Sequence, residues 1–179
     1  GMVKRSKSIS RGINTLASNT TNPSFGQLLR SPTLLLAFGF GSGLSPKAPG
    51  TVGTLAAIPL WWLLAELPLS AYLAVVLVAA IAGISICGSA SKKLGVHDHG
   101  GIVWDEFVGF WIAMAALPVS WLSLLLGFAL FRLFDILKPW PISWLDKRVS
   151  GGLGIMIDDV IAGLAAAAVI YLVTAAGLI

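Results

Sequence analysis

The chain has 179 residues, of which 56% are hydrophobic and only 11% are charged, and its mean hydropathy is +0.88. A soluble protein carries roughly 25% charged residues, so these charges could hardly cover a water-facing surface. The composition therefore argues against an ordinary soluble domain and predicts an integral membrane protein. The net charge is +4, and the first 30 residues contain five basic residues and no acid.

Residues 1–30 are basic and rich in Ser, Thr and Asn, which predicts a disordered cytoplasmic tail. Residues 31–179 are predicted to form one membrane-embedded domain. Within it, residues 33–44 are apolar but short and rich in glycine, which is typical of an interfacial or re-entrant segment. This segment leads into a loop with the sequence SPKAPGTVGT.

Five apolar segments follow along the chain. Because about 20 residues are needed to cross a bilayer as a helix, the shorter segments are predicted to be tilted, or broken helices packed inside the protein. The predicted fold is all-α, a polytopic membrane helical bundle with about five apolar helices (four to six), some short or broken. The five segments are residues 52–67, 69–90, 106–117, 119–134 and 159–179.

The basic residues also predict on which side of the membrane each loop lies. If the tail is cytoplasmic and each apolar segment crosses once, the loops at 91–104 and 135–157 both return to the cytoplasm, and both contain lysine. The turns at Pro68 and Pro118 contain no basic residue, in agreement with the positive-inside rule. The polar motifs are therefore predicted to gather on one face, as a single active site requires.

Seven of the eight acidic residues lie between positions 98 and 159. Carboxylates beside a membrane need partners and repel one another, and Mg²⁺ would satisfy both constraints because it prefers oxygen ligands. Helix capping is the alternative for Asp105 and Asp158, but it does not explain an acidic pair at each place. The predicted metal ligands are Asp105, Glu106, Asp135, Asp158 and Asp159. Because adjacent helical residues point about 100° apart, one member of each pair should bind the metal while the other supports it or contacts substrate.

Basic residues that could bind an anion lie close to these acids. Arg132 and Lys138 flank Asp135, and Asp135 and Lys138 are three residues apart, so they can share a helix face. Lys47 and Thr51 belong to the Gly- and Pro-rich loop, which can cradle an anion with its amides and hydroxyls; a plain tight connection is the alternative. The loop lacks the GxxxxGK[ST] order of a P-loop, so nucleotide binding is unsupported. The chain thus has carboxylates that could bind a metal and basic residues that could bind an anion, both at a membrane surface. This combination predicts a phosphorylated lipid headgroup as the ligand.

Two histidines, His97 and His99, flank Asp98 in the loop HDHGGIVW. Both could supply nitrogen ligands to a metal, and both are candidates for substrate binding. A hydrogen-bonding role within the loop is the alternative for each.

Four blocks of sequence occur in order: GFGSGLSPKAPGTVGTLAAIP, HDHGGIVWDEFVGFW, FRLFDILKPWPISWLD and GGLGIMIDDVIAGL. Together they resemble the phosphatidylglycerophosphatase A family over roughly residues 34–170. The resemblance implies a phosphatase domain of the bacterial inner membrane that converts phosphatidylglycerophosphate in the cytoplasmic leaflet to phosphatidylglycerol. It also implies Mg²⁺ as the cofactor.

The motifs of other phosphatase chemistries are missing from the chain. It has no Cys-x₅-Arg loop, no DxDx[TV] motif, no histidine acid-phosphatase signature and no CDP-alcohol transferase pattern. Metal-assisted hydrolysis remains, with either direct attack of water or a covalent aspartyl-phosphate. The predicted catalytic residues are Asp105, Glu106, Asp135, Lys138, Asp158 and Asp159.

A small membrane transporter or channel with an acidic ion site is the alternative function. It would place acids deep in several helices, whereas here the acids cluster near the ends of nearly pure apolar segments. An assembly or scaffold protein would have no need of paired acids. The bilayer and a phospholipid are the expected partners, nucleic acid is not, and the oligomeric state is not defined by the sequence.

Overall fold

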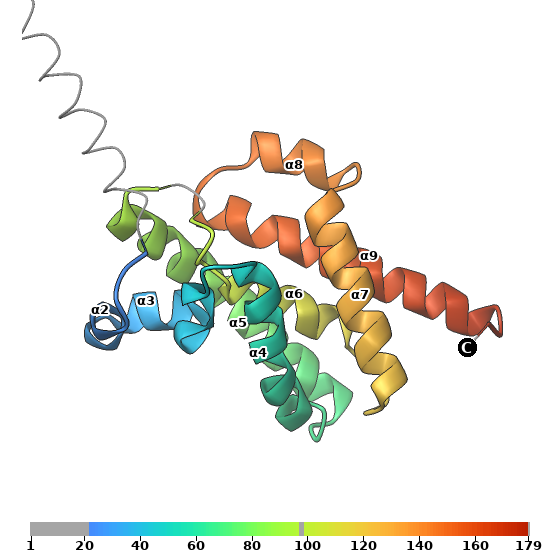
Figure 1. Cartoon of the computed structure of the whole chain (residues 1–179). Helices are drawn as coiled ribbons and strands as arrows, with labels where there is room; N and C mark the ends of the chain where they lie inside the picture. The colour runs from blue at the N-terminus through green and yellow to red at the C-terminus, as the bar shows by residue number, and fades with distance from the viewer. Residues whose placement is uncertain (1–21, 97–98, 179) are drawn as a thin grey trace, which may run out of the picture.

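The structure is a computed structural model that describes residues 22–96 and 99–178. Within these residues every regular element is helical, so the predicted all-α class is confirmed (Figure 1). The elements in chain order are α2 (Phe25–Arg30), α3 (Pro32–Ala37), the 3₁₀ helix η1 (Gly39–Leu44), α4 (Pro49–Leu64), α5 (Leu69–Leu94), α6 (Trp104–Ala113), α7 (Trp121–Leu137), α8 (Ile142–Arg148) and α9 (Gly151–Ala175).

The helical part of the chain begins before residue 31. The hydroxyl of Ser24 accepts a hydrogen bond from the Gln27 backbone N–H (3.3 Å), and the Gln27 side chain accepts one from the Ser24 N–H (2.8 Å). This capping box starts α2, and Leu28 is fully buried where α2 packs against α3 and η1. Residues 25–30, which were predicted to belong to the disordered tail, are helical in the structure; residues 1–21 lie outside the described residues.

Two of the described helices, α5 and α9, are long and apolar enough to cross a membrane. Only 22% of the most apolar window of α5 is buried, so α5 does not resemble the core helix of a soluble protein. These two helices suggest membrane association. The predicted number of about five apolar helices is not confirmed, because α4, α6 and α7 have only 16, 10 and 17 residues.

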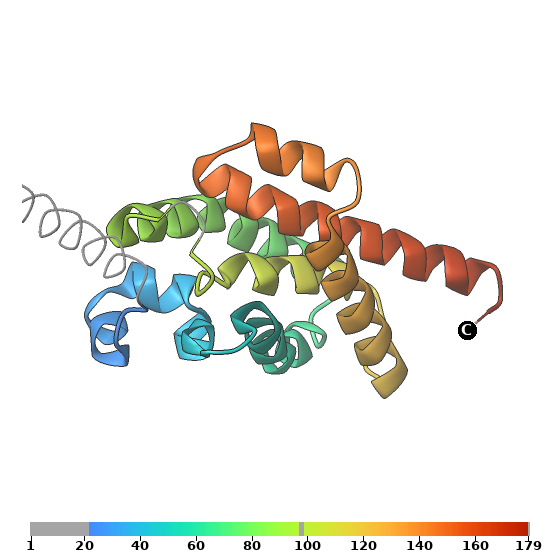
Figure 2. The ribbon, with the colours of Figure 1, turned by 45° about the horizontal axis from the view of Figure 1, so that its top comes forward.

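Helix α6 lies at the centre of the bundle, where it packs against α4, α5, α7 and α9 (Figure 2). Its ten residues extend only about 15 Å, half of a hydrocarbon core of about 30 Å. Trp111 Nε1 donates a hydrogen bond to the carbonyl of Ala57 on α4 (3.2 Å), and Trp104 Nε1 donates one to the carbonyl of Ala79 on α5 (3.1 Å). These bonds satisfy the indole donors in an apolar environment, and the Trp104 bond ties the acidic end of α6 to α5.

Helix α9 begins at Gly151, eight residues earlier than predicted. The glycines at its start were predicted to form a loop. In the structure, a side chain at Gly152 would collide with the backbone carbonyl of Ile84 on α5, so the missing side chain lets α9 pack closely against α5. Asp158 and Asp159 consequently lie about two turns inside α9 rather than at its first residues.

Gly109 marks a very close approach between α6 and α9. A Cβ atom there would lie 2.6 Å from the carbonyl oxygen of Asp159 and would also meet the ring of Phe131. Gly109→Ala is therefore expected to push α9 away from α6 and to destabilise the protein by about 1–3 kcal/mol, as overpacking typically does. The melting temperature of the purified protein in detergent measures this effect.

Gly88→Ala is the matched control, because a Cβ atom at Gly88 would have its nearest neighbours at an ordinary 3.4 Å. Its melting temperature should stay close to that of the unchanged protein. Equal melting temperatures for the two variants would contradict the close approach at Gly109.

Candidate functional site

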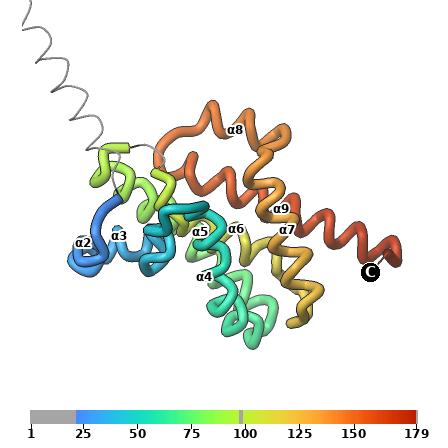
Figure 3. Tube along the Cα trace, viewed as in Figure 1, coloured from blue at the N-terminus to red at the C-terminus, as the bar shows by residue number. Residues whose placement is uncertain are grey.

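Four segments that are far apart in the sequence meet around a polar cavity of about 340 Å³. They are the loop and first turn at the start of α4, the loop and first turn at the start of α6, the end of α7 and the first half of α9, and their paths can be followed in Figure 3. Eight of the eleven predicted site residues line this cavity. They are His99, Asp105, Glu106, Arg132, Asp135, Lys138, Asp158 and Asp159.

Three carboxylates from two helices form the closest acidic group in the cavity. Asp105 and Glu106 stand in the first turn of α6, Asp159 comes from α9, and one oxygen of each lies within 4.8 Å of the others. Each also has a buried oxygen without a hydrogen-bond partner, namely Asp105 Oδ1, Glu106 Oε2 and Asp159 Oδ2. Unpaired buried carboxylates are costly, and a hard divalent cation would be a ligand for all three. The group therefore fits a metal ion.

Helix capping does not account for these acids. The N-cap of α6 is Val103, and no side chain makes a capping hydrogen bond there. Asp158 lies inside α9 and cannot cap it. The first turn of α6 nevertheless favours negative charge on Asp105 and Glu106, because the helix dipole is positive at that end.

Asp158 pairs with Lys138 instead of joining the three-carboxylate group. Its Oδ2 lies 3.5 Å from Lys138 Nζ, and the same ammonium lies 3.9 Å from Oδ1 of Asp146 on α8. Burial would lower the pKa of Lys138, but Asp158 and Asp146 outweigh burial and raise that pKa above its ordinary value. Lys138 ends α7 with a left-handed backbone (φ 48°), a conformation that costs roughly 1–2 kcal/mol. The residue is thus a charged group held at one edge of the cavity.

Arg132 supplies a second cation on the same helix. It forms an ion pair with Asp135, one turn further along α7, and its Nε is buried without a hydrogen-bond partner. A Cβ atom at Gly50 would lie 3.2 Å from both Nη atoms of Arg132 and 3.1 Å from Glu106 Oε1. The guanidinium therefore lies against the first turn of α4, whose N-terminus also favours an anion.

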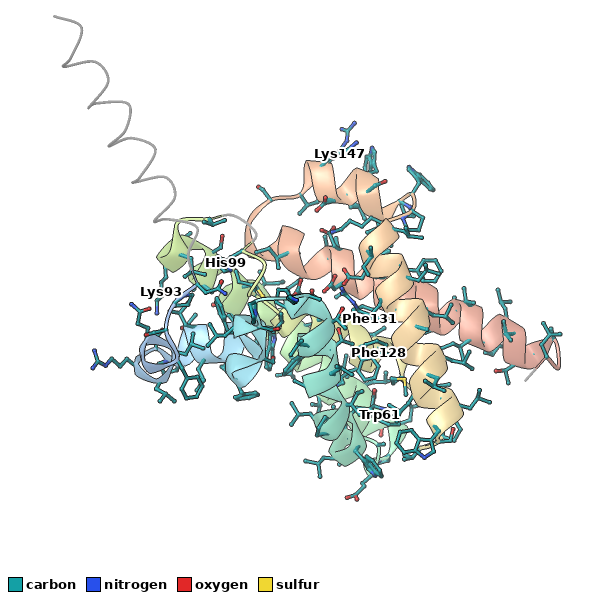
Figure 4. All side chains as sticks on the ribbon, viewed as in Figure 1. Trp61, Lys93, His99, Phe128, Phe131 and Lys147 are labelled. Carbon is teal, nitrogen blue, oxygen red and sulfur yellow. The ribbon has the colours of Figure 1, made fainter. Side chains whose placement is uncertain are left out.

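His99 is buried in the wall of the same cavity (Figure 4). Its Nδ1 accepts a hydrogen bond from the backbone N–H of Gly101 (2.9 Å), so the neutral ring carries its proton on Nε2. Nδ1 is therefore engaged within the loop and not open to a metal. His97, the other predicted histidine, lies with Asp98 outside the described residues.

Lys47 and Thr51 do not line the cavity. Lys47 is exposed, and its carbonyl accepts a hydrogen bond from the Ser45 hydroxyl (2.8 Å). The N–H of Thr51 donates to the carbonyl of Ala48 (3.0 Å), which closes the first turn of α4. Residues 48–50 line the cavity instead. Gly50, which follows Pro46 and Pro49, was the sequence signal that could have indicated this close approach.

These features define a helical protein, with two helices long and apolar enough to cross a membrane, in which carboxylates suited to a metal and cations suited to an anion share one cavity. The ion pairs Arg132–Asp135 and Lys138–Asp158 hold the cations beside the acidic group. Such a combination is typical of sites that bind phosphate together with a divalent metal.

Comparison with known proteins agrees with this class. The chain matches the family described as Phosphatidylglycerophosphatase A over residues 35–174, and it belongs to that family. It is 51% identical over 146 residues to Phosphatidylglycerophosphatase A of Escherichia coli (strain K12), covering 81% of this chain and 85% of the relative. Identity to Phosphatidylglycerophosphatase A of Haemophilus influenzae is 49% over 145 residues, covering 80% and 89%.

A third relative carries a different name. A protein of Bacteroides thetaiotaomicron, provisionally named as a phosphatidylinositol-3-phosphatase, is 40% identical over 139 residues, covering 73% of this chain and 86% of the relative. No solved structure matches the chain.

Proposed function

We propose that this protein is a phosphatase that removes the terminal phosphate monoester of phosphatidylglycerophosphate and releases phosphatidylglycerol. The relatives named Phosphatidylglycerophosphatase A, at 51% and 49% identity, support this substrate. The observation that carries the proposal is the gathering of three carboxylates, each with a buried oxygen, and two cations around one cavity. A transporter would be expected to distribute its acids along a path through the membrane, and the acids that line this cavity do not form one.

Mg²⁺ is the metal that we assign to Asp105, Glu106 and Asp159. Carboxylate oxygens and retained waters suit Mg²⁺, and the three unpartnered buried oxygens of this group support a cation at this place. When bound, Mg²⁺ would neutralise charge on the phosphoryl oxygens. Asp135 and Asp158, which were predicted as further ligands, pair with Arg132 and Lys138, so we do not assign them to the metal.

The other residues of the cavity would act on the phosphoryl group and on the attacking water. Arg132 and Lys138 bind the phosphoryl oxygens and stabilise their charge in the transition state. Asp158 has one oxygen beside Lys138, whereas Oδ1 is buried without a hydrogen-bond partner. Asp158 can therefore orient a water and accept its proton as the water oxygen bonds to phosphorus and the bond to the glycerol oxygen breaks. The departing glycerol oxygen takes up a proton from water and becomes the hydroxyl of phosphatidylglycerol.

Phosphate release by the purified protein from phosphatidylglycerophosphate in detergent tests this function. We expect release with Mg²⁺, loss of release in excess EDTA, and recovery when Mg²⁺ is added back. Full activity in excess EDTA would remove the metal from the mechanism. A higher kcat/KM on phosphatidylinositol 3-phosphate than on phosphatidylglycerophosphate would overturn the proposed substrate.

Mg²⁺ is also expected to raise the melting temperature of the protein, and to raise it more at about pH 8 than at about pH 6. Protons and metal compete for the same carboxylates, so metal affinity falls as the pH falls. A free Mg²⁺ concentration of about 100 times Kd would stabilise the protein by about 2.7 kcal/mol. Thermal unfolding in detergent measures the shift, and Asp159→Asn should reduce it at the same Mg²⁺ concentration. An undiminished shift in that variant would move the metal to another site.

We further propose that the chain crosses the bacterial inner membrane several times and that the cavity opens to the cytoplasm. The lysines in the loops at 91–104 and 135–157 support this orientation. With Cys87 replaced, single cysteines at Ser91 and Ser150 should react only with reagents that reach the cytoplasm. Labelling of either position from the periplasm of intact cells would overturn the topology.

A further inference from the structure

The outward face of α7 is an apolar stripe that leads to the acid-lined cavity. Exposed residues recur along it at intervals of three or four, which is the spacing of one helix face. The stripe consists of Leu122, Leu125, Ala129, Leu133, Ile136 and, just beyond the helix, Trp140. The opposite face is buried and carries Ser123, Gly127, Phe131 and Asp135.

Ile136 belongs both to this stripe and to the cavity. It is 63% exposed and yet lines the cavity that contains the acids. The two other exposed lining residues, Ala48 and Gly100, belong to the loops before α4 and α6. Among the described lining residues, Ile136 is therefore the large apolar side chain at the mouth. The cavity borders a polar loop surface on one side and the apolar face of α7 on another.

A phospholipid substrate makes two demands on such a mouth. Its headgroup must reach the acids and cations, while its acyl chains must stay out of water, because exposing apolar surface to water is unfavourable. The stripe from Leu122 to Ile136 is about 21 Å long at 1.5 Å per residue. That length exceeds one half of a hydrocarbon core of about 30 Å, so the stripe can accompany an acyl chain within one leaflet.

Given the proposed function, we propose that Leu133 and Ile136 form a binding track for an acyl chain of the substrate. The lipid enters the cavity sideways from the membrane over Ile136, and the first methylenes of its chain remain on the outward face of α7. Polar and ionic groups then contact only the headgroup. A second copy of this chain is the competing occupant of the stripe, and the experiment below distinguishes the two.

Two soluble substrates separate contact with the chain from chemistry at the headgroup. One is dihexanoyl phosphatidylglycerophosphate below its micelle-forming concentration, and the other is the deacylated glycerophosphoglycerophosphate. Ile136→Ser is expected to lower the ratio of kcat/KM for the diacyl substrate to kcat/KM for the deacylated one by about tenfold, because it removes one apolar contact. Leu133→Ser should lower the same ratio by less.

Two variants of matched exposure on the same helix serve as controls. Leu137→Ser changes a neighbour that is 68% exposed but does not line the cavity. Leu125→Ser changes a residue of the stripe that is also 68% exposed and lies about three turns from Ile136. Both should retain the ratio of the unchanged protein, and the melting temperature in detergent shows whether each variant is folded.

An unchanged ratio in folded Ile136→Ser would overturn the track, as would an equal loss in Leu137→Ser. If Ile136→Ser lowers kcat/KM equally for both substrates and also lowers the oligomeric mass, the acyl-chain track is overturned and a second copy of the chain occupies the stripe. If the unchanged protein releases phosphate from neither substrate, the proposed function itself fails. That result is distinct from an unchanged ratio of the two kcat/KM values, which would overturn only the track.

Discussion

Asp159→Asn is expected to lower phosphate release from phosphatidylglycerophosphate on the order of 10³-fold at saturating Mg²⁺. Asp159 is only 2% exposed and is the contribution of α9 to the three-carboxylate group. The amide keeps the shape of the side chain but removes its charge, which leaves Asp105 and Glu106 to hold the metal. Initial rates over a Mg²⁺ titration measure the effect, and the Mg²⁺ concentration for half-maximal rate should rise.

Two other carboxylates show whether the effect is specific to the metal group. Asp158→Asn should lower kcat by about 10²–10⁴-fold, as loss of a proton acceptor does, with little change in the Mg²⁺ requirement. Asp146→Asn is the control, because this carboxylate on α8 is 44% exposed and does not line the cavity. Near-normal rates in both Asp159→Asn and Asp146→Asn would show that the metal site lies elsewhere.

Arg132→Ala is expected to lower kcat/KM by about 10²–10³-fold. The guanidinium lies beside Gly50 in the first turn of α4, as Glu106 does, and its loss would also leave Asp135 without its ion-pair partner. Arg132→Lys should restore only part of the activity, because an ammonium cannot reproduce the planar fork of donors. Steady-state kinetics on phosphatidylglycerophosphate with saturating Mg²⁺ measure both variants.

Lys47→Ala is the matched control for Arg132→Ala, because it removes a cation that lies outside the cavity. Lys47 is exposed and does not line the site, so kcat/KM should stay within about twofold of the unchanged protein, as for most surface substitutions. A loss as large as that of Arg132→Ala would show that the anion also binds the loop before α4.

The local sequence was sufficient to predict which polar side chains lie together at the end of α7 and which lie together at the start of α6. Arg132, Asp135 and Lys138 follow one another at helical spacing at the end of an apolar run, and Asp105 with Glu106 begins another run. Spacing along one helix decides which side chains share a face, so these relations do not depend on the rest of the fold. The composition likewise indicated an apolar, membrane-associated chain, and the four motif blocks indicated the family.

The beginning of α9 and the different positions of its two acids depended on tertiary structure. Glycine disfavours helix when only local propensity acts, which made residues 151–154 look like a loop. Close packing against α5 at Gly152 outweighs that preference, extends α9 toward the N-terminus and places Asp158 and Asp159 inside it. Asp159 then joins the carboxylates of α6 while Asp158 pairs with Lys138.

The approach of α4 to the cavity depended on tertiary structure for the same reason. The sequence drew attention to the charged Lys47, but the backbone at Gly50 is what lies beside Arg132 and Glu106. A charged residue can be recognised from the sequence alone. The role of a glycine such as Gly50 becomes clear only when the structure shows which distant segment packs against it. Contacts between segments 50–110 residues apart decide burial and cavity shape, and no local pattern encodes which segments will meet.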